Sequence, residues 1–258
     1  IASSNGYAGI IFWIWTGSDV YDNNTITNNT ASYNGGPGIE LQQGSHTYIT
    51  NNTANSNGGS GIALCFWTNN NTLENNTVSY NEYSGIELIY YTTHNIIKNN
   101  TASHNNVSGI ALYHSSSDNT VSNNELYSNQ FGLSIVGRQP EGWINFQGTA
   151  SNNQLMNNTI SYSKSHGIYL LDLTYANNIT KNTVSNSDLF GILVENSSNN
   201  NIRNNTANLN ERGIGLVESS TIEVMDNTAN SNKISGITLI NSSKNTLHNN
   251  TACNNTYE

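Results

Sequence analysis

The carboxylates are the first residues to test for chemistry, because polysaccharide cleavage and calcium binding both depend on clustered acidic side chains. Asp172, Glu195 and Glu218 follow similar positions of a repeated pattern, so they are weak candidates for a Ca²⁺ site. We favour a solvated acidic edge for the same three residues. Glu40 and Glu87 share one column of the repeat but lie two repeats apart, which is too far for a single proton-transfer site.

The remaining candidates for chemistry are sparse. The six histidines occupy different positions of the repeat and share no ligand spacing. Met156 and Met225 are distant from each other, so a copper site is not expected. The six aspartates form no Asp-Asp pair and no Asp-x-Asp motif. We therefore expect no catalytic residue, no enzyme activity and no cofactor.

Cys65 and Cys253 are the two cysteines of the chain. Strand alternation turns both outward, and about eight repeats separate them, or roughly 38 Å at one strand spacing per repeat. A disulfide needs Cα atoms within about 7 Å, so the two cannot pair within one chain. They either remain free thiols or, as we favour, form intermolecular disulfides with neighbouring chains.

Fourteen Asn-x-Ser/Thr sequons indicate N-glycosylation of an exported protein. An inward asparagine followed by an outward threonine also generates such sequons automatically. If the second asparagine of each pair points inward, the first points outward and is accessible, so we expect some sites to be occupied. The candidate acceptors are Asn23, Asn28, Asn51, Asn70, Asn75, Asn99, Asn106, Asn157, Asn178, Asn196, Asn204, Asn241, Asn249 and Asn254.

Aromatic residues form a loose outward stripe and also occur in two insertions. Such rings can contact sugars or protein partners, and we favour a protein contact. Scattered surface aromatics and a tolerated loop are the simpler interpretations. The candidates for an interface or glycan contact are Trp13, Trp15, Phe66, Trp67, Tyr91, Trp143 and Phe146.

An internal sequence repeat fixes the positions of most of these candidate residues. A Gly-Ile-x-Leu unit recurs with glycine at 9, 38, 61, 85, 109, 132, 167, 191, 213 and 236, and seven of the nine intervals are 22 to 24 residues. Each repeat holds three short segments of period two, which is typical of strands. We predict an all-β, single-domain parallel β-helix over 1–258, with about ten to eleven rungs of 22–24 residues and inserted loops near 13–24 and 137–149.

Stacking of the rungs explains the recurring unit. Ile39 and Leu41 point inward and Glu40 outward, so neighbouring rungs lay isoleucine on isoleucine. The glycine before each isoleucine is expected to turn a corner with positive φ. The second asparagine of each pair is expected to point inward and form an amide ladder. These asparagines are Asn29, Asn52, Asn76, Asn100, Asn124, Asn158, Asn182, Asn205, Asn227 and Asn250.

With these motifs the sequence resembles the PbH1 repeats of NosD-type and carbohydrate-active right-handed β-helices. Its Gly-Ile-x-Leu…Asn-Asn-Thr-x-x-x-Asn form is especially similar to Asn/Thr-rich surface proteins of methanogenic archaea, including sheath-type envelope proteins. The resemblance implies a right-handed coil and a position at the cell surface. It is specific for the fold rather than for a function, because the repeated residues are core and corner positions.

Composition and chain ends narrow the function. Net charge is −9 with eight Lys and Arg, so the basic footprint of a nucleic-acid binder is missing, and no apolar run approaches a membrane span. Both ends fall at one phase of the repeat without a polar cap, which favours a piece of a longer array or chains that stack.

We predict a structural protein of an extracellular assembly, such as an archaeal sheath, surface layer or filament. Its partners would be other copies of itself and covalently attached N-glycans. The alternative is a carbohydrate-binding or carbohydrate-processing β-helix that uses the aromatic stripe and the 137–149 insertion. An ice-binding face on the outward threonines is a third interpretation, which the bulky and irregular flanking residues disfavour.

Overall fold

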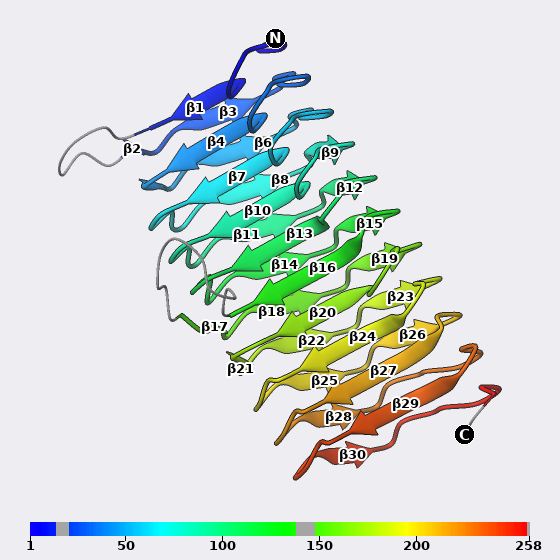
Figure 1. Cartoon of the computed structure of the whole chain (residues 1–258). Helices are drawn as coiled ribbons and strands as arrows, with labels where there is room; N and C mark the ends of the chain where they lie inside the picture. The colour runs from blue at the N-terminus through cyan, green and yellow to red at the C-terminus, as the bar shows by residue number, and fades with distance from the viewer. Residues whose placement is uncertain (14–20, 138–147, 257–258) are drawn as a thin grey trace.

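The protein is an all-β coil in which three parallel sheets run along one axis (Figure 1). A computed structural model describes residues 1–13, 21–137 and 148–256. Within these ranges every regular element is a strand, and no helix is available to cross a membrane. The predicted parallel β-helix is therefore confirmed.

The first sheet contains the Gly-Ile-x-Leu units. Its ten strands, in spatial order, are β1 (Ile10–Phe12), β4 (Ile39–Gln42), β7 (Ile62–Cys65), β10 (Ile86–Ile89), β13 (Ser108–Tyr113), β16 (Phe131–Val136), β20 (Ile168–Leu171), β24 (Phe190–Glu195), β27 (Arg212–Val217) and β29 (Ser235–Ile240).

The second sheet also has ten strands, and the third has six. The second consists of β3 (Thr25–Thr27), β6 (Tyr48–Thr50), β8 (Thr72–Glu74), β11 (Ile96–Lys98), β14 (Thr120–Ser122), β18 (Gln154–Met156), β22 (Asn178–Thr180), β25 (Asn201–Arg203), β28 (Glu223–Met225) and β30 (Thr246–His248). The third consists of β9 (Thr77–Ser79), β12 (Thr101–Ser103), β15 (Glu125–Tyr127), β19 (Thr159–Ser161), β23 (Thr183–Ser185) and β26 (Thr206–Asn208). Two short pairs, β2 (Tyr21–Asp22) with β5 (Gly44–Ser45) and β17 (Ala150–Ser151) with β21 (Thr174–Tyr175), complete the coil.

The core consists of stacked apolar columns, as the repeat predicts. Ile39 pairs with Ile62 and Leu41 with Leu64, and all four side chains are fully buried. The second sheet contributes a third apolar column, and the third sheet contributes a column of alanines, valines, leucine and isoleucine. One rung cannot bury its apolar face alone, so each rung is stable only against its neighbours.

The glycine before each isoleucine does not have positive φ, so that prediction is wrong. Positive φ falls instead on residues at the turns, such as Asn51 and Asn75. The glycine is required by close packing along the axis. A Cβ on Gly85 would lie 2.7 Å from the carbonyl oxygen of Gly109 and 2.9 Å from Asn105 Nδ2.

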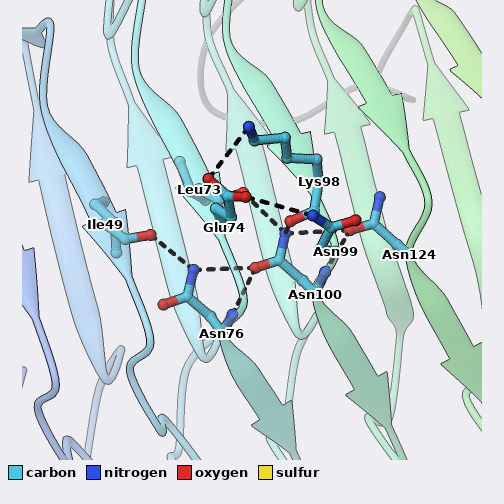
Figure 2. Close-up of polar contacts among 8 residues, drawn as sticks. All are labelled: Ile49, Leu73, Glu74, Asn76, Lys98, Asn99, Asn100 and Asn124. Carbon is cyan, nitrogen blue, oxygen red and sulfur yellow. Dashed lines mark hydrogen bonds and ion pairs between the residues drawn. The ribbon is translucent and has the colours of Figure 1, made fainter.

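The inward asparagines form the predicted ladder. Asn76 Nδ2 donates to the Ile49 carbonyl at 2.8 Å and to Asn100 Oδ1 at 3.0 Å (Figure 2). Asn100 repeats this pattern with Leu73 and Asn124. Each amide therefore satisfies backbone groups at a buried bend and also bonds to the next rung, which removes the cost of leaving those groups without partners.

Two further asparagine ladders were not predicted. One stands where the third sheet leads to the first, and Asn57, Asn81 and Asn105 bond there from rung to rung. The other stands where the first sheet leads to the second, and it contains Asn71 and Asn95. The three ladders mark the three corners of each rung, so most of the asparagine content has a structural role.

Candidate functional site

The outer face of the first sheet carries ionisable and hydroxyl side chains on neighbouring rungs. Parallel pairing fixes the register of its middle column. From β4 to β16 this column reads Glu40, Ala63, Glu87, Ala111 and Ser134. Small residues separate the two glutamates from each other and from the next polar group. The glutamates lie two strand spacings apart, roughly 9.6 Å between backbones.

Glu40 is the most unusual member of this column. It points outward as predicted, yet it is only 4% exposed. Its Oε1 accepts a hydrogen bond from Gln42 Nε2 at 2.6 Å, whereas its buried Oε2 has no hydrogen-bond partner. Burial, followed by the nearby Glu40 carboxylate, raises the pKa of Tyr7. Glu40 is therefore a covered carboxylate that lies against Gln42 and Tyr7.

Glu87 is half-buried and leans toward the preceding rung. Its Oε2 accepts a hydrogen bond from Ser60 Oγ at 2.5 Å. Burial raises the pKa of Glu87, and the hydrogen bond from Ser60 opposes this only in part. A carboxyl group with a raised pKa is suited to donate a proton.

Hydroxyl groups extend the polar face beyond Glu87. Ser108 Oγ and Ser134 Oγ are 2.8 Å apart, and Ser134 Oγ donates to the Tyr113 hydroxyl at 3.3 Å. Burial raises the pKa of Tyr113, so its phenol stays protonated at neutral pH and can donate a hydrogen bond. Glu40, Glu87, Tyr113, Ser108 and Ser134 are defined here as the polar face.

Cys65 lies beside the polar face on β7. It points outward as predicted, but it is half-buried, and burial followed by Glu40 and Glu87 raises the pKa of its thiol. A protonated thiol is a poor nucleophile for disulfide exchange. Cys253 is exposed, and both cysteines are free within the chain. The intermolecular disulfide stays a prediction, which Cys65 suits less well than the sequence suggested.

Aromatic side chains stack on one another at the turn that follows the first sheet. The Phe66 and Tyr90 rings lie 5.0 Å apart and the Tyr90 and His114 rings 5.4 Å apart, both nearly parallel. Trp67 stacks on Tyr91 at 5.7 Å with an interplanar angle of 5°. Because these rings cover one another's faces, a sugar ring has access chiefly to ring edges and to the rings at the ends of each stack.

Stacking also accounts for the conformation of this turn. Phe66 and Trp67 have φ of 51° and 56°, which is unfavourable for bulky residues. Aromatic contacts between rungs offset part of that strain. Positive φ recurs at the same turn on neighbouring rungs, as at Tyr90, Tyr91 and His114, so it belongs to the coil rather than to a site of its own.

The other aromatic candidates are dispersed. Trp13 is 49% exposed and Trp67 53% exposed, whereas Phe66 and Tyr91 are half-buried. Trp15, Trp143 and Phe146 lie outside the described residues. The contact role of these aromatics stays a prediction.

An aromatic cluster missed by the sequence analysis lies farther along the same face. Phe131 stacks on Tyr169 at 5.5 Å, and the buried His166 lies beside Tyr169 and Phe190. His166 Nδ1 accepts the Phe190 backbone N–H at 3.3 Å, and burial lowers the pKa of His166 to about 4. The Tyr169 hydroxyl donates to Glu195 at 2.6 Å. The cluster therefore closes one end of the polar face with apolar rings.

The acidic trio does not form one column of the sheet. Glu195 pairs with Leu171 and Val217 on the sheet, whereas Asp172 and Glu218 occupy the turn. Asp172 Oδ1 accepts a hydrogen bond from Asn196 at 2.6 Å. In the described part of the chain, no three His, Cys, Asp or Glu side chains are arranged to hold a metal ion.

The predicted orientation of the paired asparagines is confirmed. Asn51, Asn75 and Asn99 are exposed, whereas the asparagine that follows each of them is buried. Most other sequon asparagines are also exposed, and Asn178 is half-buried. Their glycosylation stays a prediction.

The sequence matches the family described as the right-handed beta helix region, over residues 3–147 and 141–252. The chain belongs to the right-handed β-helix family. This match covers nearly the whole chain and confirms the right-handed coil. No protein of curated function matches the sequence.

Solved right-handed β-helices share the fold at low identity. The A-module of the Azotobacter vinelandii mannuronan C-5 epimerase AlgE6 matches with a TM-score of 0.72 and 15% identity, over 89% of this chain and 64% of that one. The A-module of AlgE4 from the same organism matches with a TM-score of 0.68 and 13% identity, over 93% and 78%. The enzymatically active domain of bacteriophage CBA120 tailspike protein 2 matches with a TM-score of 0.66 and 11% identity, over 80% and 36%.

These identities show a common fold and no more. This β-helix spans about 64% of the length of the first of these structures. The likeness to archaeal sheath proteins has no counterpart among these matches. Self-association, N-glycans and an extracellular location remain predictions of the sequence.

Proposed function

We propose that this β-helix is a carbohydrate-binding protein, and that a polysaccharide chain lies along the outer face of the first sheet. The observation that carries the proposal is the polar face itself. Glu40, Glu87 and Tyr113 bring two carboxylates and a phenol to one side of neighbouring rungs. Sugars are recognised through such acceptors and donors for their hydroxyl groups.

The geometry of the fold suits an extended ligand. Strands repeat about every 4.8 Å along the axis, so contacts recur in register with a linear polymer. Other β-helices of this shape include two mannuronan epimerase modules, which supports a glycan ligand by analogy of fold. That analogy favours the carbohydrate interpretation over the structural assembly.

A binding experiment with matched variants tests the proposal. Affinity electrophoresis against a panel of soluble polysaccharides should show retardation of the intact chain. Glu40→Gln and Tyr113→Phe should weaken that retardation at least fivefold. Glu125→Gln, an exposed residue on β15 of the third sheet, is the control and should leave it unchanged. Absence of retardation by every polysaccharide, or equal losses in all three variants, would overturn the proposal.

A second candidate function is hydrolysis of the bound glycan, which the state of Glu87 favours. Its raised pKa favours the protonated form, and its side chain bonds to Ser60 on the rung that lies between it and Glu40. Inverting glycosidases hold their two carboxyl groups about 6.5–9.5 Å apart, so that water fits between the base and the sugar. The two-rung separation of about 9.6 Å between backbones is too wide for direct proton transfer between Glu40 and Glu87, as the sequence indicated, but an inverting site needs only that both carboxyl groups reach the sugar and the water between them.

Release of reducing ends from the polysaccharide that binds best tests this second candidate. The intact chain should release them, and Glu87→Gln should lower the rate at least a hundredfold, a larger loss than its effect on binding. Glu125→Gln is again the control. No release by the intact chain, or full activity in Glu87→Gln, would refute hydrolysis and leave the binding proposal standing.

A further inference from the structure

A hollow of about 270 Å³ lies at the turn where the first sheet leads to the second, beside β21. It is defined here as the corner hollow, and the lining residues that matter to its chemistry are Leu173, Tyr175, Asn196, Ser198, Glu218 and Ser220. A second hollow of about 300 Å³ is its neighbour along the chain, because the residues that follow Ser198 and Ser220 line it. Both volumes lie at the lower end of the range for small-molecule sites.

A change in turn length accounts for the corner hollow. From the last inward residue of the first-sheet strand to the next corner asparagine, the chain advances seven positions on the rung of β20 (170–177) and six on the rung of β24 (194–200). The longer turn has positive φ at both Asp172 and Leu173, whereas the shorter one has it only at Asn196 before the corner. Leu173 is 47% exposed and forms a wall, beyond which the shorter turn recedes.

The corner hollow offers hydrogen-bonding groups that the protein leaves unused. Asn196 Nδ2 donates to Asp172 Oδ1 at 2.6 Å. Among the residues that the structure describes, no side chain or backbone group bonds to Asn196 Oδ1, to the Glu218 carboxylate or to the Ser220 hydroxyl. Asn196 and Glu218 are exposed and Ser220 is half-buried, so a ligand can reach all three.

The floor of the corner hollow is held in place, and one side of it is apolar. Thr174 is fully buried and Ser197 nearly so. Thr174 Oγ1 donates to Ser197 Oγ at 2.9 Å, and Ser197 Oγ donates to the Glu195 carbonyl at 2.8 Å. Tyr175, which is 40% exposed, and Leu173 supply the apolar side. A floor that is already ordered reduces the entropy that binding would cost.

The lining separates the possible classes of ligand. A lipid would need apolar walls, whereas most of the lining consists of hydroxyl and amide side chains. A phosphate group would need clustered Lys and Arg, and Lys244 is the one cation that lines either hollow. The described residues contain no set of three metal ligands. Sugar hydroxyls both donate and accept hydrogen bonds, as do the serine, threonine and asparagine side chains of the lining.

We infer that the corner hollow binds one or two rings of a neutral oligosaccharide, as a second sugar site outside the polar face. The inference rests on the proposed function for its class of ligand. Glu218 accepts hydrogen bonds from sugar hydroxyls, Ser220 donates or accepts them, and Tyr175 packs against the C–H groups of a sugar ring. The rung of β24 lies three strand spacings from Tyr113 on β13, roughly 14 Å, so one polysaccharide of several units can contact both sites.

Disaccharides test the corner hollow directly. Saturation-transfer NMR and titration would use cellobiose, mannobiose, maltose and laminaribiose with the chain made in a host that adds no N-glycans, so that Asn196 stays unmodified. At least one disaccharide should bind. Tyr175→Ala and Glu218→Ala should each weaken its affinity at least fivefold, and Ser220→Trp, which fills the hollow, should abolish binding. The matched controls Tyr162→Ala and Glu125→Ala, exposed residues of the third-sheet side, should leave the affinity unchanged.

A polar-face variant separates the two proposals. Tyr113→Phe should leave disaccharide affinity unchanged, and circular dichroism verifies that each variant is folded. Disaccharide binding that survives Ser220→Trp, or that falls as much with Tyr113→Phe as with Tyr175→Ala, would overturn the inference while the proposed function stands. Binding of none of the four disaccharides would also overturn it, and the polysaccharide panel above would then decide the proposed function separately.

Discussion

Replacement of Asn100 by alanine tests the physical basis of the fold. The Asn100 amide donates to the Leu73 carbonyl at 3.0 Å and to Asn124 Oδ1 at 3.1 Å, and its Oδ1 accepts the buried Asn76 backbone N–H at 2.9 Å. Alanine leaves that N–H without a partner, at a cost of about 1–3 kcal/mol, and forfeits two donations of about 1 kcal/mol each. We expect Asn100→Ala to lower the free energy of unfolding by about 3–5 kcal/mol.

The neighbouring asparagine provides a matched control. Asn99 is exposed and has φ of 57°. Its side-chain amide donates one long hydrogen bond, to Glu74 Oε1 at 3.4 Å (Figure 2). Glycine adopts that φ readily, so Asn99→Gly should change stability by less than about 0.5 kcal/mol. Guanidinium denaturation followed by tryptophan fluorescence measures both variants.

Hydrogen exchange locates the effect within the coil. In a solenoid each rung contacts only its neighbours, so Asn100→Ala should speed exchange of the Asn76 amide and of β8, β11 and β14 more than that of β25 and β28. Two results would refute the ladder argument: equal stabilities for Asn100→Ala and Asn99→Gly, or exchange that quickens uniformly along the chain.

Further predictions concern packing, protonation and thiol access. Gly85→Ala should cost about 1–3 kcal/mol, because its Cβ would lie 2.7 Å from the Gly109 carbonyl oxygen, whereas Gly6→Ala, with no atom within 4 Å, should be neutral in the same denaturation assay. Burial lowers the pKa of His166 from 6.5 to about 4, so the folded state binds fewer protons and stability should fall by about 3 kcal/mol as pH drops from 6.5 to 4. The variant His166→Gln should lack that part of the pH dependence, and an identical profile would contradict it. Because burial raises the pKa of Cys65, a disulfide reagent at pH 8 should label exposed Cys253 on the order of tenfold faster, and equal rates would argue against a buried Cys65.

The core was predictable because stacking requires the same type of residue at the same position of every rung. Ile39, Ile62 and Ile86 face one another in register, so the sequence shows the column many times over. The inward position of Asn52 followed from the same repetition. The signal for the ladder of Asn81 and Asn105 was also present, since those asparagines recur four residues before the Gly-Ile unit.

Features that depend on particular pairs of rungs were not predictable. The burial of Glu40 depends on its neighbours Gln42 and Tyr7, which have no equivalents at the same positions of the next rung. The similar repeat positions assigned to Asp172, Glu195 and Glu218 did not place them in one column, for a related reason. A shift of one residue at the turn moves Glu195 onto the sheet and Asp172 off it, and spacing alone did not resolve that shift.

The contrast between columns indicates where function belongs in this coil. Outward threonines Thr53, Thr77 and Thr101 repeat along the third sheet, as expected where each rung meets the same solvent and the same neighbours. The middle column of the first sheet changes at almost every rung, although the same stacking applies to it. Stacking alone gives no reason for Glu40 and Glu87 to alternate with alanine. Under the proposed function, a ligand that contacts these rungs differently would supply that reason, because it would impose a separate requirement on each one.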